Sequence, residues 1–251
     1  MTFKKSLMIL AAGAAFISTS VSAYVLLSPE RTWSSAPTYI IDNRGQATIT
    51  DNDGGLSATI NAINANSAWN GAGSGTVITA VAGNVSSFTL GDNVPMLNFE
   101  DPTGQCDGTC LAATFTGFYV QQGRGRNRTY TIVDADIVTN TAYDWTSQSE
   151  PDGCSGEFYI EGVQVHEIGH ALGLGHTNVS GATMFPSVSA CNNSPASIEA
   201  DDIAGINALY GGDDGGGGGT CDLGQSGDSC SSNSQCCSGK CRGPNGNRTC
   251  R

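Results

Sequence analysis

The chain has little charge, and most of that charge is negative. Only 14% of its 251 residues are charged, with 11 basic and 23 acidic side chains and a formal net charge of −12. A nucleic-acid binder needs a basic face for phosphate contacts, and a protein that docks on anionic lipid needs basic clusters. We therefore expect neither nucleic acid nor an anionic membrane as a partner.

Long apolar runs are absent after the first residues. Residues 1–23 combine two lysines, an apolar run over 7–17 and a small-residue ending, Val21-Ser22-Ala23. This is the layout of a secretory signal peptide, whereas an uncleaved anchor needs a run of about 20 apolar residues. We expect a secreted, extracellular protein with no membrane insertion, in which cysteines form disulfides.

Histidine is scarce, and its few copies are clustered. The chain has three histidines, and all of them lie in the sequence HEIGHALGLGH over residues 166–176. His166 and His170 are four residues apart, so a helix places both on one face as a pair of zinc ligands. Gly173 can end that helix and let His176 return to the same point. Three imidazoles leave one position on zinc open for water, as in catalytic sites.

Glu167 directly follows the first of these histidines. Its carboxylate can lie near the open position and act as general base toward a water that zinc has made more acidic. A bare pair of histidines four apart usually means solvated or core side chains. Here the glutamate, the glycine and the third histidine coincide, which favours a metal-dependent hydrolase.

The sequence HEIGHALGLGH resembles the extended zinc signature of the metzincin metallopeptidases. Ala182–Pro186 (ATMFP) resembles their Met-turn, which implies that Met184 lies beneath the metal; ordinary core filling is the alternative. Residues 201–211 resemble the closing helix of the matrixin subgroup, and Leu111–Phe115 resembles its substrate-side edge strand. The resemblance covers about residues 33–211.

The resemblance implies an α+β fold, with a twisted, mostly parallel five-stranded sheet, an active-site helix and a C-terminal helix. It implies a zinc endopeptidase that binds an extended protein or peptide substrate along the edge strand. Carried over by position, it assigns one catalytic zinc to His166, His170 and His176, and the role of base to Glu167. It assigns the substrate pocket to Ala113, Pro186, Ser187 and Val188.

Histidines are lacking upstream of His166, which excludes the histidine-bound structural zinc of many matrixins. Calcium can replace such bracing, since carboxylate oxygens suit it. The candidate calcium ligands are Asp51, Asp53, Asp134 and Asp136. Ordinary solvated acids in turns and strands are an equally good interpretation.

The pattern of apolar and β-branched residues predicts the main elements of residues 33–211. We expect helices over 56–69, 163–172 and 198–209, and a turn over 51–55. Strands are expected over 37–42, 75–79, 87–90, 111–120 and 129–138.

A glycine run divides the chain. Residues 212–220 contain five consecutive glycines, which cannot pack a core and form a linker. Four cysteines precede the linker, and four cysteines allow three pairings. We expect Cys106–Cys110, because a short separation favours closure, and therefore Cys154–Cys191.

The C-terminal residues 221–251 hold six cysteines, in a segment too short to bury a core of its own. The adjacent pair Cys236-Cys237 resembles the inhibitor-cystine-knot miniproteins, in a small knottin-like domain. That resemblance implies the pairs Cys221–Cys237, Cys230–Cys241 and Cys236–Cys250. The module is either a binder of matrix, carbohydrate or cell surface, or a protease-resistant appendage.

Three further expectations concern regulation and partners. The short N-terminal segment 24–32, extended to residue 35, lacks the cysteine that caps the zinc in many family prodomains. Twelve residues span up to about 40 Å, which is enough to lie in a cleft, and we hypothesise that this stretch, or nothing, controls activity. Arg124, Arg126 and Arg128 form the one basic cluster in the acidic domain over residues 33–211, for which a solvated loop is favoured over a site for acidic or sulfated polymer. A monomer is the default expectation.

The main alternative places the function elsewhere. In that hypothesis the chain is a toxin-like or adhesive secreted protein whose knot carries the main activity. The intact zinc signature argues against it, because an inert relic would be expected to lose Glu167 or a ligand.

Overall fold

The structure is a computed structural model that describes residues 23–85, 88–122, 129–150 and 153–211, with residue 229 and the stretches 241–243 and 248–250. Several expectations lie outside these residues. They are the signal peptide, the arginine cluster, the linker and the three disulfides of the knot. In the C-terminal part, the described strands β11 (Cys241–Arg242) and β12 (Thr249–Cys250) pair antiparallel.

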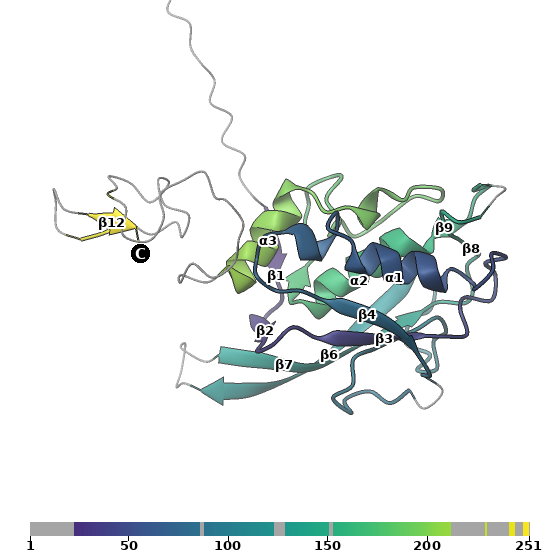
Figure 1. The fold of residues 1–251 in the computed structure, drawn as a ribbon, viewed down its shortest axis with the longest axis horizontal. Helices are drawn as coiled ribbons and strands as arrows, with labels where there is room; N and C mark the ends of the chain where they lie inside the picture. The colour runs from purple at the N-terminus through teal and green to yellow at the C-terminus, as the bar shows by residue number, and fades with distance from the viewer. Residues whose placement is uncertain are drawn as a thin grey trace, which may run out of the picture.

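A six-stranded sheet lies beneath a layer of helices (Figure 1). Its order is β2 (Arg31–Trp33), β7 (Thr129–Thr139), β5 (Met96–Asn98), β3 (Thr38–Asp42) and β4 (Thr79–Gly83). These neighbours are all parallel. Strand β6 (Ala112–Gln122) runs antiparallel to β7. The expected mostly parallel sheet is therefore present, with β2 as an additional strand.

The longer predicted strands appear close to their expected places, as β3, β6 and β7. The strand expected over 75–79 is wrong, since β4 begins only at Thr79. Gly75 has a φ of +77°, a conformation that ends an extended run. Residues 88–90 also form no strand. The short β5 was not predicted, because three residues carry too little pattern.

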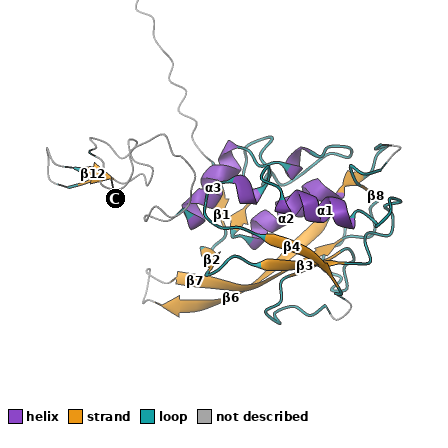
Figure 2. Ribbon diagram, viewed as in Figure 1, coloured by secondary structure: helices purple, strands orange, loops and turns teal. Residues whose placement is uncertain are grey.

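In the part of the chain that the structure describes, three α-helices cover one face of the sheet (Figure 2). They are α1 (Leu56–Asn64), α2 (Ile160–Ala171) and α3 (Ala200–Tyr210). Helix α1 is shorter than expected because Ala65 turns extended, and Trp69 falls in the separate 3-10 turn η1 (Trp69–Gly71). The buried Trp69 ring then donates from Nε1 to the Val165 carbonyl of α2.

The hydrophobic core lies between this helical layer and the sheet. It combines Ile41, Leu97 and Ile137 from the strands with Ile63 of α1 and Ile168 of α2, all fully buried. Helix α2 packs against α1 and β6, so it is enclosed on several sides. Such packing fixes α2 as a rigid platform for the side chains that it carries.

The described part of the N-terminal segment pairs with the domain. Strand β1 (Val25–Leu26) runs antiparallel to β10 (Leu174–Gly175), and β2 extends the sheet beside β7. No described residue of this segment lines the cleft beside the histidines. The described segment therefore does not lie in this cleft, because its backbone is used in strand pairing, and its control of activity stays a prediction.

Smaller elements complete the domain. Strand β8 (Trp145–Thr146) pairs with β9 (Phe158–Tyr159), and the 3-10 turn η2 (Ser194–Ala196) precedes α3.

The structure forms Cys106–Cys110 and Cys154–Cys191, the two pairs expected before the linker. Among the described residues, no helix is long and apolar enough to cross a membrane.

Candidate metal centre

Helix α2 and the turn after it position the three histidines. His166 and His170 lie one turn apart on α2, which ends at Ala171. Gly173 then adopts a φ of +105°, and a Cβ there would lie 2.5 Å from the Arg31 carbonyl oxygen. Only glycine fits this reversal, after which β10 returns the chain and presents His176 to the same point.

The three imidazoles converge through the same ring nitrogen. Nε2 of His176 lies 3.2 Å from Nε2 of His166 and 3.1 Å from Nε2 of His170. Three nitrogens at about 2.0–2.1 Å from a tetrahedral ion would be separated by roughly 3.3 Å. The observed spacing therefore fits one divalent ion held by all three.

Hydrogen bonds at Nδ1, the other ring nitrogen, fix the tautomer of two of the imidazoles. Nδ1 of His166 lies 2.6 Å from the Thr183 carbonyl, and Nδ1 of His170 lies 2.8 Å from the Leu174 carbonyl. Carbonyl oxygens only accept, so each Nδ1 donates and each neutral ring leaves a lone pair on Nε2. Lone pairs that face each other repel unless a cation lies between them, so the donor set fits Zn²⁺.

The protonation of the rings also favours metal binding. Burial lowers the pKa of His170 below its ordinary value, and the neighbouring His166 lowers it further, against the opposing charge of Glu167. Burial likewise lowers the pKa of His176, with His170 as the second cause. The neutral imidazole, which is the ligand form, is thereby favoured.

The turn around Met184 supports these histidines from below. The Thr183 carbonyl orients His166, and the Met184 carbonyl accepts the N–H of Thr177, beside His176. Met184 itself is buried against α2, where a Cβ on Gly169 would lie 2.3 Å from its sulfur. Asp202 of α3 holds the turn by accepting the N–H groups of Thr183 and Met184, at 2.7 and 3.0 Å.

Glu167 lies beside the histidines and is 5% exposed. Its Oε2 accepts a hydrogen bond of 2.6 Å from the Thr114 hydroxyl of β6. Sequence reasoning did not single out Thr114, because its pairing with Glu167 depends on how β6 packs on α2.

A cleft of about 340 Å³ opens next to Glu167 and the histidines. Of the predicted pocket residues, Pro186, Ser187 and Val188 line it. Ala113 is not among the lining residues, and its neighbour Ala112 is, because successive side chains of a strand point to opposite faces. Leu111 of the predicted edge strand and Phe185 of the predicted turn add apolar walls, and further apolar walls that were not predicted are Tyr143, Phe158 and Val163.

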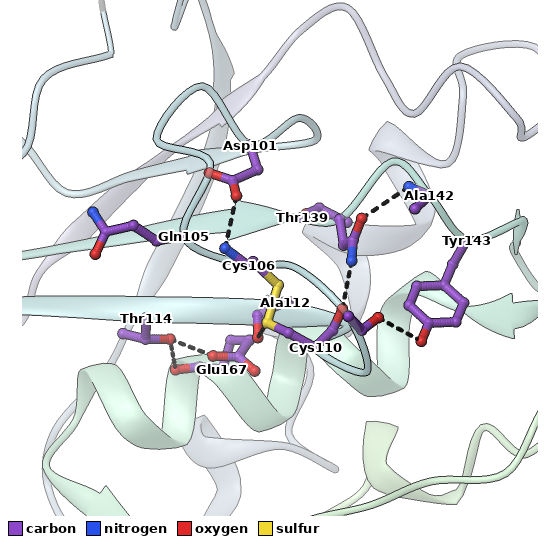
Figure 3. Close-up of a disulfide and its surroundings, with 12 residues drawn as sticks. Asp101, Gln105, Cys106, Cys110, Ala112, Thr114, Thr139, Ala142, Tyr143 and Glu167 are labelled. Atoms are coloured by element: carbon purple, nitrogen blue, oxygen red, sulfur yellow. Dashed lines mark hydrogen bonds between the residues drawn. A yellow bond between two sulfur atoms is a disulfide. The ribbon is translucent and has the colours of Figure 1, made fainter.

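The Cys106–Cys110 loop forms part of the rim of this cleft (Figure 3). Its Cys110 carbonyl accepts from Asn140 Nδ2 at 2.7 Å, and its Gly108 carbonyl accepts from the Tyr143 hydroxyl at 3.0 Å. The Cys106 N–H donates to Asp101 at 2.8 Å. The disulfide and these bonds hold the rim against the segment after β7.

The four candidate calcium ligands fall into two separate groups. The Asp51 carboxylate accepts hydrogen bonds from Gly55 N–H, Ser147 and Ser149, and Asp53 accepts from Ser57. Asp134 and Asp136 lie two residues apart on β7, both 1% exposed, and each keeps one oxygen without a partner. The structure thus assigns the first group to turn formation, and calcium at either group stays a prediction.

Comparison with known proteins agrees with this geometry. Residues 120–211 match the Matrixin family model. This matrixin-like segment contains β7, all three histidines, the Met184 turn and α3.

Individual relatives match shorter stretches. Metalloendoproteinase 5-MMP of Arabidopsis thaliana is 52% identical over 60 residues, which are 24% of this chain and 16% of that protein. Matrilysin of Rattus norvegicus is 47% identical over 49 residues, 20% of this chain and 18% of that protein. Neutrophil collagenase of Homo sapiens is 33% identical over 121 residues, 48% of this chain and 20% of that protein. The chain thus spans less than a quarter of the length of these relatives.

Proposed function

We propose that the chain is a secreted, zinc-dependent endopeptidase. The observation that carries the proposal is the convergence of three histidine Nε2 atoms beside a buried glutamate at the edge of a cleft. The matrixin-like segment and the metalloendoproteinases that resemble it support the same conclusion. His166, His170 and His176 would hold the zinc.

The chemistry divides between the metal and Glu167. Zinc, when bound, polarises the scissile carbonyl and makes water a nucleophile at neutral pH. Glu167 accepts the proton of the attacking water as general base and then delivers it to the leaving amine. Met184 and Asp202 act indirectly, by holding the turn whose Thr183 carbonyl orients His166.

An extended peptide would bind along β6. Strand β6 pairs with β7 on one side, and no described strand pairs with its other edge, which would offer main-chain hydrogen bonds to substrate near Ala112. The neighbouring cleft has apolar walls that include Phe158, Val163 and Val188. We therefore expect an apolar side chain immediately after the cleaved bond.

The remaining parts of the chain would serve export and targeting. Residues 1–23 would be removed as a signal peptide, and residues 212–220 would tether a disulfide-bonded module over 221–251. That module would bind matrix, carbohydrate or cell surface and localise the peptidase. One zinc per chain and a monomer complete the proposal.

The test is a peptide-digestion assay with matched variants of the secreted protein. We expect the zinc-loaded protein to cleave denatured collagen or casein, and a chelator to stop it. Glu167→Gln should lose about 10²- to 10⁴-fold in kcat while retaining zinc, and His170→Ala should lose both zinc and activity. An inactive zinc-loaded protein would contradict the proposal and favour the alternative in which the C-terminal module carries the function.

A further inference from the structure

Thr114 donates a hydrogen bond to the carboxylate of Glu167. Its hydroxyl lies 2.6 Å from Oε2 and 3.0 Å from the Glu167 backbone carbonyl (Figure 3). One hydroxyl hydrogen serves both acceptors, and the shorter contact to the charged oxygen dominates. The two residues are 53 positions apart in sequence, so the contact depends on the packing of β6 against α2.

The contact leaves the two carboxylate oxygens unequal. Oε2 is engaged by Thr114, whereas Oε1 has no donor among the described residues. A glutamate side chain has several rotatable bonds, and its 5% exposure together with one strong hydrogen bond restricts it to a single orientation. Oε2 therefore has one acceptor site engaged, whereas Oε1 keeps both of its sites for the proton of an attacking water.

We propose that Thr114 is a positioning residue that holds Glu167 so that Oε1 serves as the base. This inference rests on the proposed peptidase function, because it assigns a role within that site. Strand β6 would then have two roles: its backbone would bind the peptide, and its Thr114 hydroxyl would orient the base. Thr114 acts through Glu167 and itself touches neither the metal nor the reacting atoms.

Substitutions at this position separate positioning from folding. Thr114→Val keeps the shape and removes the hydroxyl, Thr114→Ala is a second variant without the hydroxyl, and Thr114→Ser restores it. Thr59→Val is the matched control, since Thr59 is a buried threonine of α1, outside the peptide-binding strand, and its hydroxyl has no partner among the described residues. The assays measure kcat, KM and bound zinc of the full secreted chain on one quenched peptide.

We expect Thr114→Val and Thr114→Ala to lose about 10- to 100-fold in kcat, as is typical when a group that orients an active-site side chain is removed. KM and bound zinc should stay at wild-type values, Thr114→Ser should recover most of kcat, and Thr59→Val should match wild type. An unchanged kcat in Thr114→Val, a loss confined to KM or zinc, or a Thr114→Ser variant as slow as Thr114→Val would overturn the inference.

A readout independent of activity keeps this inference separate from the proposed function. Crystal structures of metal-free wild type and Thr114→Val should show the Glu167 carboxylate in one orientation in wild type and displaced in the variant. Identical carboxylates in both would overturn the positioning role. A zinc-loaded wild type that cleaves no peptide would instead refute the proposed function while these structures still test the contact.

Discussion

Gly169 is the residue on which the contact between α2 and Met184 depends. A Cβ there would lie 2.3 Å from the Met184 sulfur and 2.6 Å from Cζ2 of Trp69. Because both neighbours are buried, Gly169→Ala should destabilise the protein by about 1–3 kcal/mol through overpacking. Urea unfolding measures the change.

Gly162→Ala is the matched control for this prediction, since it makes the same substitution in the same helix. Its added Cβ would lie 2.9 Å from Asn193 Oδ1, the end of a side chain that can move. A Gly169→Ala variant as stable as Gly162→Ala would contradict the close packing of Met184 and Trp69 on Gly169.

The metal ligands could be predicted from the sequence. The contacts that other segments make with the site could not. His166, His170 and His176 are separated by one helical turn and one glycine reversal, so their spacing alone brings them together. The contact of Thr114 with Glu167 could not be predicted, because it joins a strand to a helix 53 residues away in sequence. The resemblance assigns Ala113 to the pocket, whereas Ala112 lines the cleft, because the resemblance does not fix which face of β6 points into the cleft.

Helix α3 connects to the metal centre through one carboxylate. Asp202 accepts the N–H groups of Thr183, Met184 and Glu199, and it is 1% exposed. Asp202→Ala would leave buried donors without a partner, which costs about 1–3 kcal/mol, and would loosen the carbonyl that orients His166. We expect a lower Tm and weaker zinc retention against a chelator.

Asp201→Asn is the control for that prediction. Asp201 precedes Asp202 on the same helix, and its Oδ1 accepts the Ala23 N–H, a donor that the proposed signal-peptide cleavage would remove, while its Oδ2 has no partner among the described residues. Its replacement should leave zinc retention near that of wild type. Equal zinc loss in both variants would contradict the specific role of Asp202.

The N-terminal segment should act as a stabilising element. Trp33 donates from Nε1 to the Ala171 carbonyl at 2.9 Å, and its backbone N–H donates to the Tyr210 hydroxyl. Tyr210 in turn donates to the Leu172 carbonyl at 2.7 Å, so both contacts lie at the end of α2. Trp33→Phe should lose about 1 kcal/mol for the missing hydrogen bond.

Removal of residues 24–33 should lower Tm more than Trp33→Phe, because it also removes β1 and β2. Thermal unfolding of the two variants beside a chain beginning at Tyr24 measures this. A trimmed chain with unchanged Tm and a faster peptidase rate would instead support the hypothesis of a regulatory segment.

The elements that the sequence predicts correctly are those whose own residues show a clear apolar or β-branched pattern. The strands near β3, β6 and β7 and the helices α2 and α3 follow from β-branched runs and apolar spacing. The strand β4 has the sequence TAVAG, whose alanines and glycine have little strand preference. Parallel pairing with β3 fixes β4, and such long-range pairing cannot be read from five residues.

At the scale of the whole molecule, a buried acid links stability to pH. Burial raises the pKa of Asp136 to about 7, with the neighbouring Asp134 as the second cause. In the unfolded chain the pKa of this carboxyl is about 3.9. At pH values between the two pKa values, the native state therefore binds more protons than the unfolded state. Its contribution therefore lowers stability as pH rises from about 4 to about 7.

Asp136→Asn should remove the decrease in stability that ionisation of Asp136 causes as pH rises. The Tm of the variant relative to wild type should therefore be higher at pH 8 than at pH 5. Calorimetry in calcium-free buffer measures both values, because calcium is the competing interpretation of this pair. If added calcium raises the Tm of wild type but not that of Asp136→Asn, the two acids form a cation site, and the interpretation of Asp136 as a destabilising buried acid is wrong.

The central claim is that three imidazoles hold one zinc beside Glu167. X-ray absorption at the zinc edge of the purified, folded protein tests it most directly. We predict one zinc per chain with three imidazole nitrogens at about 2.0–2.1 Å and a lighter oxygen ligand in the remaining position. Sulfur ligands, fewer than three imidazoles, or no tightly held zinc would contradict the claim.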